Sequence, residues 1–120
     1  MAAPNIVNVA TITGITTGRA LTTTTTTQLL TNVASSNKVF KVNSIVVANV
    51  DGSSAADVTI AYNDGSTSYH LASTVSVPAD STLIVVDKNA SLYLEEGTKL
   101  VGGASANSDL EAVISYEEIS

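Results

Sequence analysis

The stretch of residues 45–62 constrains the fold more than any other part of the chain. It contains two apolar runs, residues 45–50 and 58–62, separated by the polar sequence Asp-Gly-Ser-Ser at 51–54. The first run has apolar residues on both of its faces, which is typical of a strand buried on both sides. In the second run apolar and polar faces alternate, as they do in a half-buried strand. Two such runs joined by a Gly/Ser/Asp loop predict the centre of an antiparallel sheet.

Turn residues and further short strands continue along the chain. The sequence Asn-Asp-Gly-Ser at 63–66 predicts a tight hairpin, because Gly, Asn and Asp adopt the positive φ that such turns require. Residues 94–100 are typical of an arch that crosses from one sheet to the other, and we expect residues 102–109 to form a flexible loop. Residues 110–117 alternate cleanly between apolar and polar, which fixes the register of a last strand.

This pattern predicts an all-β fold. About seven short strands, spaced roughly 8 to 12 residues apart, indicate an antiparallel β-sandwich, of jelly-roll or immunoglobulin-like order. The 120 residues include no cysteine, and a chain of this length buries enough surface to fold without disulfides. We expect an extended arm at 1–37 and the sandwich domain at 38–120.

The N-terminal 37 residues differ from the rest in composition. Their one charged side chain is Arg19, and eleven of the sixteen threonines fall within the first 31 residues. Because threonine favours a pleated backbone, we expect an edge strand or an extended clamp that lies on a surface; a low-complexity linker is the alternative. The residues expected to make the contacts of this arm are Ile6, Val9, Ile12, Ile15, Leu21, Thr22, Thr24, Thr26, Leu29 and Leu30.

Charge and hydropathy narrow the partners. Residues 38–120 carry four lysines against eleven carboxylates, and an acidic surface repels phosphate backbones, so we expect no nucleic-acid partner. No apolar run approaches the roughly 18 residues of a membrane span, so we expect no membrane partner. The first residues lack the basic region of a signal peptide, which indicates synthesis in a cytoplasm.

The sequence gives little sign of enzymatic chemistry, and we expect neither an enzyme nor a cofactor. His70 is the one histidine, and a catalytic histidine needs an orienting partner; no Gly-x-Ser-x-Gly elbow is present. Asp51, Asp57 and Asp64 offer oxygen ligands, yet the spacing of a calcium loop is absent, so we interpret them as turn formers and expect no metal.

The four tyrosines bear on carbohydrate binding. Lectin-like sandwiches stack sugars on exposed aromatic side chains, and this chain has no tryptophan. The tyrosines Tyr62, Tyr69, Tyr93 and Tyr116 fall at alternating positions, which predicts that they belong to the core.

Several segments together resemble a recurrent type of small virion structural protein of tailed bacteriophages. They are the Thr-rich leader, the strand at 39–49, the Val-Pro-Ala-Asp-Ser sequence at 77–81, the arch at 94–100 and the Val-Ile-Ser-Tyr sequence at 113–116. The resemblance covers about two thirds of the chain. It implies a non-enzymatic β-sandwich of the head, neck or tail, made in the host cytoplasm and located in the virion.

The resemblance and the composition lead to one main hypothesis. We expect a capsid decoration or cement protein, present in many copies or as a homo-oligomer, whose arm docks on other virion proteins such as the major capsid protein. The alternatives are a neck, collar or tail component that contacts neck or tail subunits, and a receptor-binding or carbohydrate-binding module.

Overall fold

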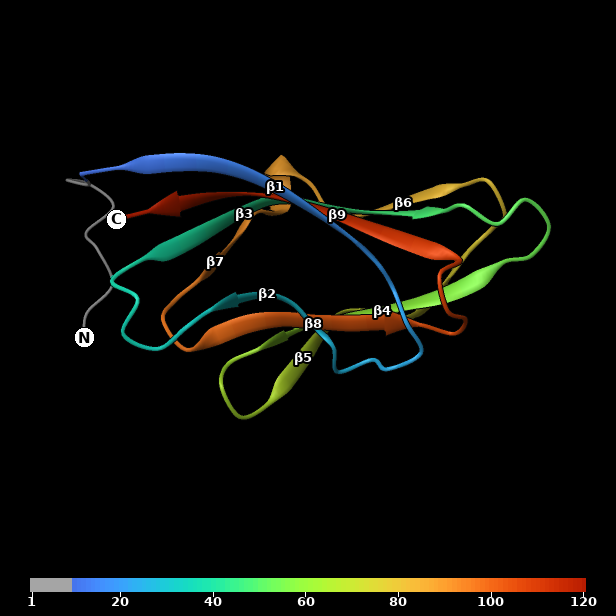
Figure 1. Ribbon diagram of the computed structural model, residues 1–120, viewed down its shortest axis with the longest axis horizontal. Helices are drawn as coiled ribbons and strands as arrows, with labels where there is room; N and C mark the ends of the chain where they lie inside the picture. The colour runs from blue at the N-terminus through green and yellow to red at the C-terminus, as the bar shows by residue number, and fades with distance from the viewer. Residues whose placement is uncertain (1–9) are drawn as a thin grey trace.

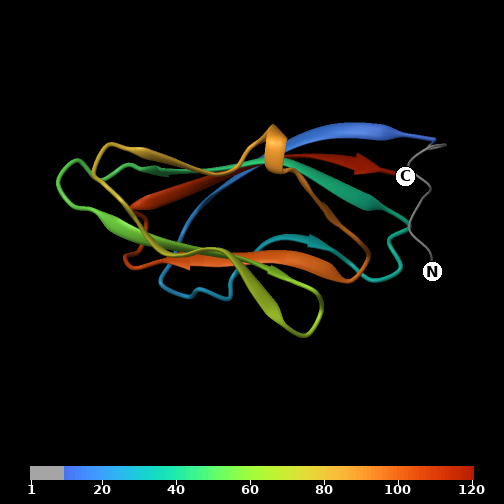
Figure 2. The same cartoon turned by 180° about the vertical axis from the view of Figure 1, so that it is seen from behind.

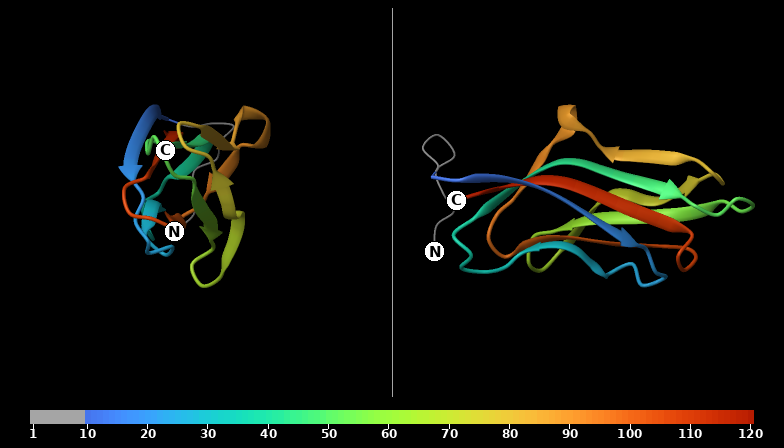
Figure 3. Two further views of the ribbon diagram at one scale, coloured as in Figure 1. Left: turned by 90° about the vertical axis from the view of Figure 1, so that its right-hand side faces the viewer. Right: turned by 45° about the horizontal axis from the view of Figure 1, so that its top comes forward.

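The computed structural model describes residues 10–120, which form two packed antiparallel sheets (Figure 1). The five-stranded sheet contains β1 (Ile12–Ala20), β9 (Leu110–Ile119), β3 (Val39–Asn49), β6 (Thr82–Val86) and β7 (Leu92–Leu94). The four-stranded sheet contains β2 (Gln28–Asn32), β8 (Thr98–Ala104), β4 (Ala56–Asn63) and β5 (Ser68–Val77). This arrangement confirms the predicted β-sandwich, and Figure 3 shows it from one end and in an oblique view with the top turned forward.

Helical structure in residues 10–120 is limited to one short element. The 3-10 turn η1 (Lys88–Ala90) lies between β6 and β7, and the Asp87 side chain accepts a hydrogen bond from the Asn89 N–H at its start. No helix in this part of the chain has the length and apolar character that crossing a bilayer requires.

The strand order is that of a jelly roll. The five-stranded sheet runs β1-β9-β3-β6, with β7 continuing the edge that β6 begins, and the four-stranded sheet runs β2-β8-β4-β5. The pairs are therefore nested along the chain: β1 with β9, β2 with β8, β3 with β6 and β7, and β4 with β5. A long antiparallel ribbon rolled into two sheets gives this order, so the jelly-roll alternative holds and the immunoglobulin-like one does not.

The core lies between the sheets and draws on both of them. Leu94, at the end of β7, begins the predicted arch, which crosses from the five-stranded sheet to β8 in the other. Side chains with no more than 1% exposure include Leu21, Val42, Ile45, Val47, Val58, Ile60, Val77, Leu94, Leu100, Leu110 and Ala112. The arch and the alternation of β9 were thus predicted correctly.

Strand β3 corrects one detail of the prediction. Its ladder with β9 has an irregularity between Val42 and Ser44. Ile45 and Val47 are fully buried, whereas Val46 is only partly buried because it lies on the outer face of the sheet. The apolar run is therefore not buried on both sides.

The described part of the predicted arm, residues 10–37, is built into the sandwich. β1 pairs with β9 along its whole length, and β2 pairs with β8. Leu21 is 1% exposed and Leu30 is 8% exposed, and both belong to the core cluster. These two leucines tie the segment to the domain, so over the described residues position 37 does not separate an arm from a sandwich.

The threonine run, residues 22–27, lies against β8, and this contact corrects the prediction of a flexible loop that begins at residue 102. The Ala104 and Gly102 N–H groups donate to the carbonyls of Thr22 and Thr27 at 2.8 and 2.9 Å. A Cβ on Gly103 would lie 2.6 Å from the Thr24 carbonyl oxygen, a distance that no side chain tolerates. The glycine pair is therefore a buried part of β8, selected by close backbone approach, and not the flexible loop that we expected.

Candidate functional site

The outer face of the five-stranded sheet carries a row of apolar and small side chains. Ile45 and Val47 of β3 point into the core, so the alternation of the strand places Val46 on the other side. The registers between strands then align three rows across this face: Gly18, Val113, Val46 and Ile84; Ala20, Glu111, Ala48 and Thr82; and Thr16, Ser115 and Ser44. We call these three rows the outer sheet face.

The outer sheet face is apolar and nearly free of charge. Ile84 is 61% exposed and Val113 is 44% exposed, although both are aliphatic. Glu111 is the single carboxylate in the three rows, whereas the chain contains eleven. Exposed apolar surface that is contiguous in this way marks an interaction site more often than isolated exposed leucines or valines do.

A shallow hollow lies on the same face. It has a volume of about 460 Å³ and is lined by residues of β3, β6, η1 and β9, among them Ser44, Val46, Ile84 and Ser115. Its aliphatic lining residues are Val46, Ile84 and Val86, and its two charged ones, Asp87 and Lys88, lie at the start of η1. The shape fits a projecting apolar side chain of a partner protein better than it fits a charged ligand.

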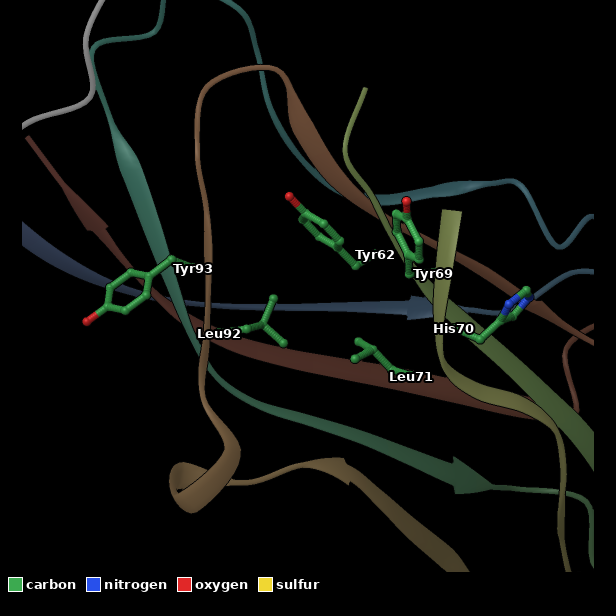
Figure 4. Close-up of a pocket in the computed structure, with 6 residues that line it drawn as sticks. All are labelled: Tyr62, Tyr69, His70, Leu71, Leu92 and Tyr93. Carbon is green, nitrogen blue, oxygen red and sulfur yellow. The ribbon is translucent and has the colours of Figure 1, made fainter. Parts of the chain in front are cut away.

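A second candidate site is an aromatic groove between the two sheets. It has a volume of about 280 Å³ and lies where β4 and β5 approach β7. Its lining residues are Tyr62, Tyr69, His70, Leu71, Leu92 and Tyr93 (Figure 4). Figure 2 shows the β4–β5 hairpin beside β7 from the other side of the molecule.

The tyrosines divide into two pairs, which corrects the prediction that all four belong to the core. Tyr62 and Tyr116 pack against the core cluster, and the Tyr116 ring lies 5.1 Å from that of Phe40. Burial, together with the nearby Glu118 carboxylate, raises the pKa of Tyr116. Tyr69 and Tyr93, in contrast, are 58% and 45% exposed.

His70 occupies the position that strand alternation predicts. It projects from β5 on the side opposite to Tyr69 and Leu71 and is exposed (Figure 4). Within residues 10–120, no hydrogen bond joins its side chain to a carboxylate. The arrangement therefore offers no orienting partner for general-base chemistry.

Of the three aspartates interpreted as turn formers, Asp51 and Asp64 do shape turns, whereas Asp57 lies within strand β4. The Asp51 carboxylate accepts a hydrogen bond from the Ser53 N–H at 3.0 Å. Asp64 accepts from the N–H groups of Thr67 and Ser66, at 2.8 and 3.0 Å, and these bonds lower its pKa. Within residues 10–120 no three acidic or histidine side chains gather in a group that could hold a metal ion.

The structure disperses the residues predicted to make the contacts of the arm. Ile6 and Val9 lie outside the described residues. Leu21 and Leu30 are in the core, so they are not accessible to a partner, and Ile15 and Leu29 are half-buried. The exposed members are Ile12, Thr22, Thr24 and Thr26, and they lie on β1 and on the loop that follows it.

Sequence reasoning missed the outer sheet face, although a signal for it was present. The run at 45–50, which we interpreted as a strand buried on both sides, has apolar residues at consecutive positions, and so has the segment 82–86. In a two-layer sandwich one face of each strand has no layer above it, so Val46 and Ile84 are left at the surface. Consecutive apolar residues in such a fold therefore predict either a partner or a further layer.

Comparison with known proteins gives only distant structural similarity. No family of known proteins matches the chain, and no curated protein matches it. The nucleoplasmin-like N-terminal domain of Drosophila FKBP39 aligns with a TM-score of 0.44 and 13% identity, over 86% of this chain and 87% of that domain. None of the structures described here exceeds 20% identity to this chain.

Two further structural neighbours are viral. A pentameric capsid protein from metagenomic phage sequences aligns with a TM-score of 0.40 and 20% identity, over 87% of this chain and 64% of that one. The structure of the virus-like particle of extra small virus from the giant freshwater prawn Macrobrachium rosenbergii aligns with a TM-score of 0.38 and 12% identity. The alignment covers 98% of this chain and 85% of that one.

Proposed function

We propose that this chain is a non-enzymatic structural protein of a bacteriophage virion, and specifically a capsid decoration protein. The observation that carries the proposal is the outer sheet face, where Val46, Ile84 and Val113 present uncharged surface on a protein of formal net charge −6. Such a face docks by shape on another protein. The resemblance of the chain to small phage virion proteins supplies the class of partner.

The structure changes the way in which the N-terminal segment takes part in this docking. Leu21 and Leu30 hold the segment to the core and are unavailable to a partner. Thr16, Gly18 and Ala20 of β1 instead form the border of the outer sheet face. The partner therefore contacts the segment as one strand of a rigid sheet. This differs from the free arm, which would gain order only on binding.

Binding to particles assembled without this chain tests the proposal. Purified wild-type protein is added back, and the bound copies are counted by quantitative mass spectrometry. Ile84→Asp should reduce the bound copies at least about tenfold, because it places a charge in the apolar face. Val33→Asp is the matched control, since Val33 is also 61% exposed but lies in the loop between β2 and β3.

The outcome separates the alternatives within the virion. Copies in proportion to the major capsid protein support decoration, whereas a few copies per particle support a neck, collar or tail component. Absence of the chain from purified particles, or equal binding of the two variants, would overturn the proposed docking face.

Carbohydrate binding is the second candidate function. The exposure of Tyr69 and Tyr93 in one groove favours it, because sugars stack on exposed aromatic rings. A glycan array should then give binding that Tyr69→Ala abolishes and that Ile84→Asp leaves unchanged. An array without any binding would remove this candidate and would leave the structural proposal intact.

A further inference from the structure

Over residues 10–120, strand β1 has one edge without a pairing partner. It is the outermost strand of the five-stranded sheet, and among these residues it pairs with β9 alone. The pairing covers all nine residues from Ile12 to Ala20 without any shift in register. The strand therefore offers a straight row of backbone groups on its other side.

The hydrogen bonds at the two ends of the strand show which backbone groups point outward. Thr11 and Ser120 exchange two backbone hydrogen bonds of 2.9 Å, and the Leu21 N–H donates to Leu110 at 2.8 Å. The backbone N–H and C=O groups of the odd-numbered residues in this segment thus point toward β9. Since antiparallel ladders alternate, the even-numbered residues direct their N–H and C=O groups to the open side: Ile12, Gly14, Thr16, Gly18 and Ala20.

The usual devices that block edge pairing are missing from β1. Soluble proteins protect a sheet edge with charged side chains, proline, bulges or a covering loop. β1 contains no carboxylate, no proline and no bulge. Its one charged residue, Arg19, donates a hydrogen bond to the carbonyl of Gln28, the first residue of β2, and so is directed toward the other sheet.

The other edges of the sandwich do carry such devices. β2 has only five residues and a register shift between Gln28 and Leu30. The β5 edge has two register shifts with β4 and a left-handed residue, Thr74, at a φ of 47°. The β6–β7 edge is interrupted by η1. Among residues 10–120, β1 is therefore the one long and regular edge left open.

We propose that β1 pairs with β1 of a second copy of this chain, antiparallel and centred on Thr16. Thr16 is the midpoint of the strand, so this register uses all five outward residues of both copies and forms about ten backbone hydrogen bonds. The two five-stranded sheets become one continuous sheet, and the two outer sheet faces lie side by side. This self-complementary contact follows a two-fold axis.

The charge distribution favours a second copy as the occupant. Each copy has a formal net charge of −6, so two copies approach most easily where carboxylates are absent. Glu117 is aligned with Gly14, and the proposed register continues that row into Gly18 and Val113 of the second copy. No carboxylate of one copy then faces a carboxylate of the other across the joint.

Sedimentation of the purified chain tests the pairing without any virion component, so its result is independent of the proposed function. The wild type should dimerise. Gly14→Pro removes an outward N–H and leaves the β9 ladder intact, and should raise the dimer Kd at least about tenfold while the chain keeps the circular-dichroism spectrum of the wild type. Gly14→Ala is the control that keeps the N–H, and a Cβ there meets no atom within 4 Å.

A single cysteine provides a second test, because the chain contains none. The two Thr16 residues would form a hydrogen-bonded pair with Cα atoms about 5.5 Å apart, which is within disulfide range. Thr16→Cys should therefore give a covalent dimer on oxidation, whereas Ser76→Cys on the β5 edge should not. This variant decides the question if Gly14→Pro fails to fold. A monomeric wild type, or equal cross-linking of both cysteine variants, would overturn the proposal.

Discussion

Two edge strands of similar length, β1 and β5, differ in whether their free edge can pair with a further strand. β1 has nine residues and β5 has ten, and both are mostly exposed. β1 keeps an unbroken register with β9, whereas β5 shifts register twice against β4 and contains a left-handed residue. One edge therefore remains open to a further strand, and the other is closed to it by its own irregularity.

The difference shows that edge protection depends on backbone irregularity as well as on charge. Neither strand contains a carboxylate, so composition alone does not distinguish them. The regularity of their ladders distinguishes them, and each strand is also anchored at one end by a buried residue. β1 continues into the buried Leu21, and β5 ends at Val77, whose carbonyl binds a buried asparagine.

The largest loss of unfolding free energy should come from replacing Leu21, the buried residue that anchors β1 to the core. Leu21→Ala removes a side chain that is 1% exposed and leaves a cavity beneath the start of the threonine run, so it should cost about 3 kcal/mol of unfolding free energy. Urea denaturation measures it. Ile12→Ala, at a 57% exposed position of the same strand, should cost less than about 1 kcal/mol. Equal losses would mean that β1 is not anchored through Leu21.

Asn49, the buried residue that anchors the end of β5, should contribute somewhat less to the unfolding free energy than Leu21 does. The Asn49 side-chain amide donates to the carbonyls of Val77 and Ser54 at 2.9 and 3.0 Å, and the residue is 3% exposed. Asn49→Ala leaves these acceptors without a donor and should cost about 2 kcal/mol. Asn89→Ala, an exposed change in η1, is the control for loss of an amide. A cost near zero would show that water replaces the amide.

The β-sandwich was predictable from the sequence because short, local residue patterns mark its strands and turns. Alternation and turn residues located β3, β4, β5 and β9, and the Asn-Asp-Gly-Ser turn has Gly65 at a φ of 108° as expected. The role of residues 10–32 was not predictable in this way. Whether a threonine-rich strand is an arm or the edge of a sheet depends on its partner, and β1 finds its partner about a hundred positions further along the chain.

The candidate site was less predictable for the same reason. Tyr69 and Tyr93 were both assigned to the core, yet they lie on the edge strands β5 and β7, and Tyr93 alternates with the buried Leu94 and so projects away from the core. The outer sheet face likewise arises from registers that bring Gly18, Val113 and Ile84 into one row. Sequence gives the face on which a residue lies within its strand, but only the strand order shows what covers that face.

Two substitutions, one to glycine on β5 and one from glycine on β1, should each stabilise the fold by a small amount. Thr74→Gly relieves a left-handed conformation that β-branched residues disfavour, and should stabilise the fold by up to about 1 kcal/mol. Gly14→Ala on β1 should stabilise by about 0.5 kcal/mol, because Gly14 is not in the left-handed region and alanine restricts the unfolded chain. Thermal denaturation of both variants measures these gains, and destabilisation by Thr74→Gly would contradict the strain at β5.

The smallest effect concerns the turn that leads into β5, and it depends on pH. Backbone hydrogen bonds from Thr67 and then Ser66 lower the pKa of Asp64 below its ordinary value of 3.8. The unfolded chain therefore binds the proton more readily than the folded one does. The stabilisation by the carboxylate is fully present above the unfolded pKa and is lost as the pH falls through the folded pKa. The difference in unfolding free energy between the wild type and Asp64→Asn should thus be constant near neutral pH and should shrink below pH 3.8. A difference that stays constant down to the lowest pH would mean that this carboxylate does not hold the β5 hairpin in place.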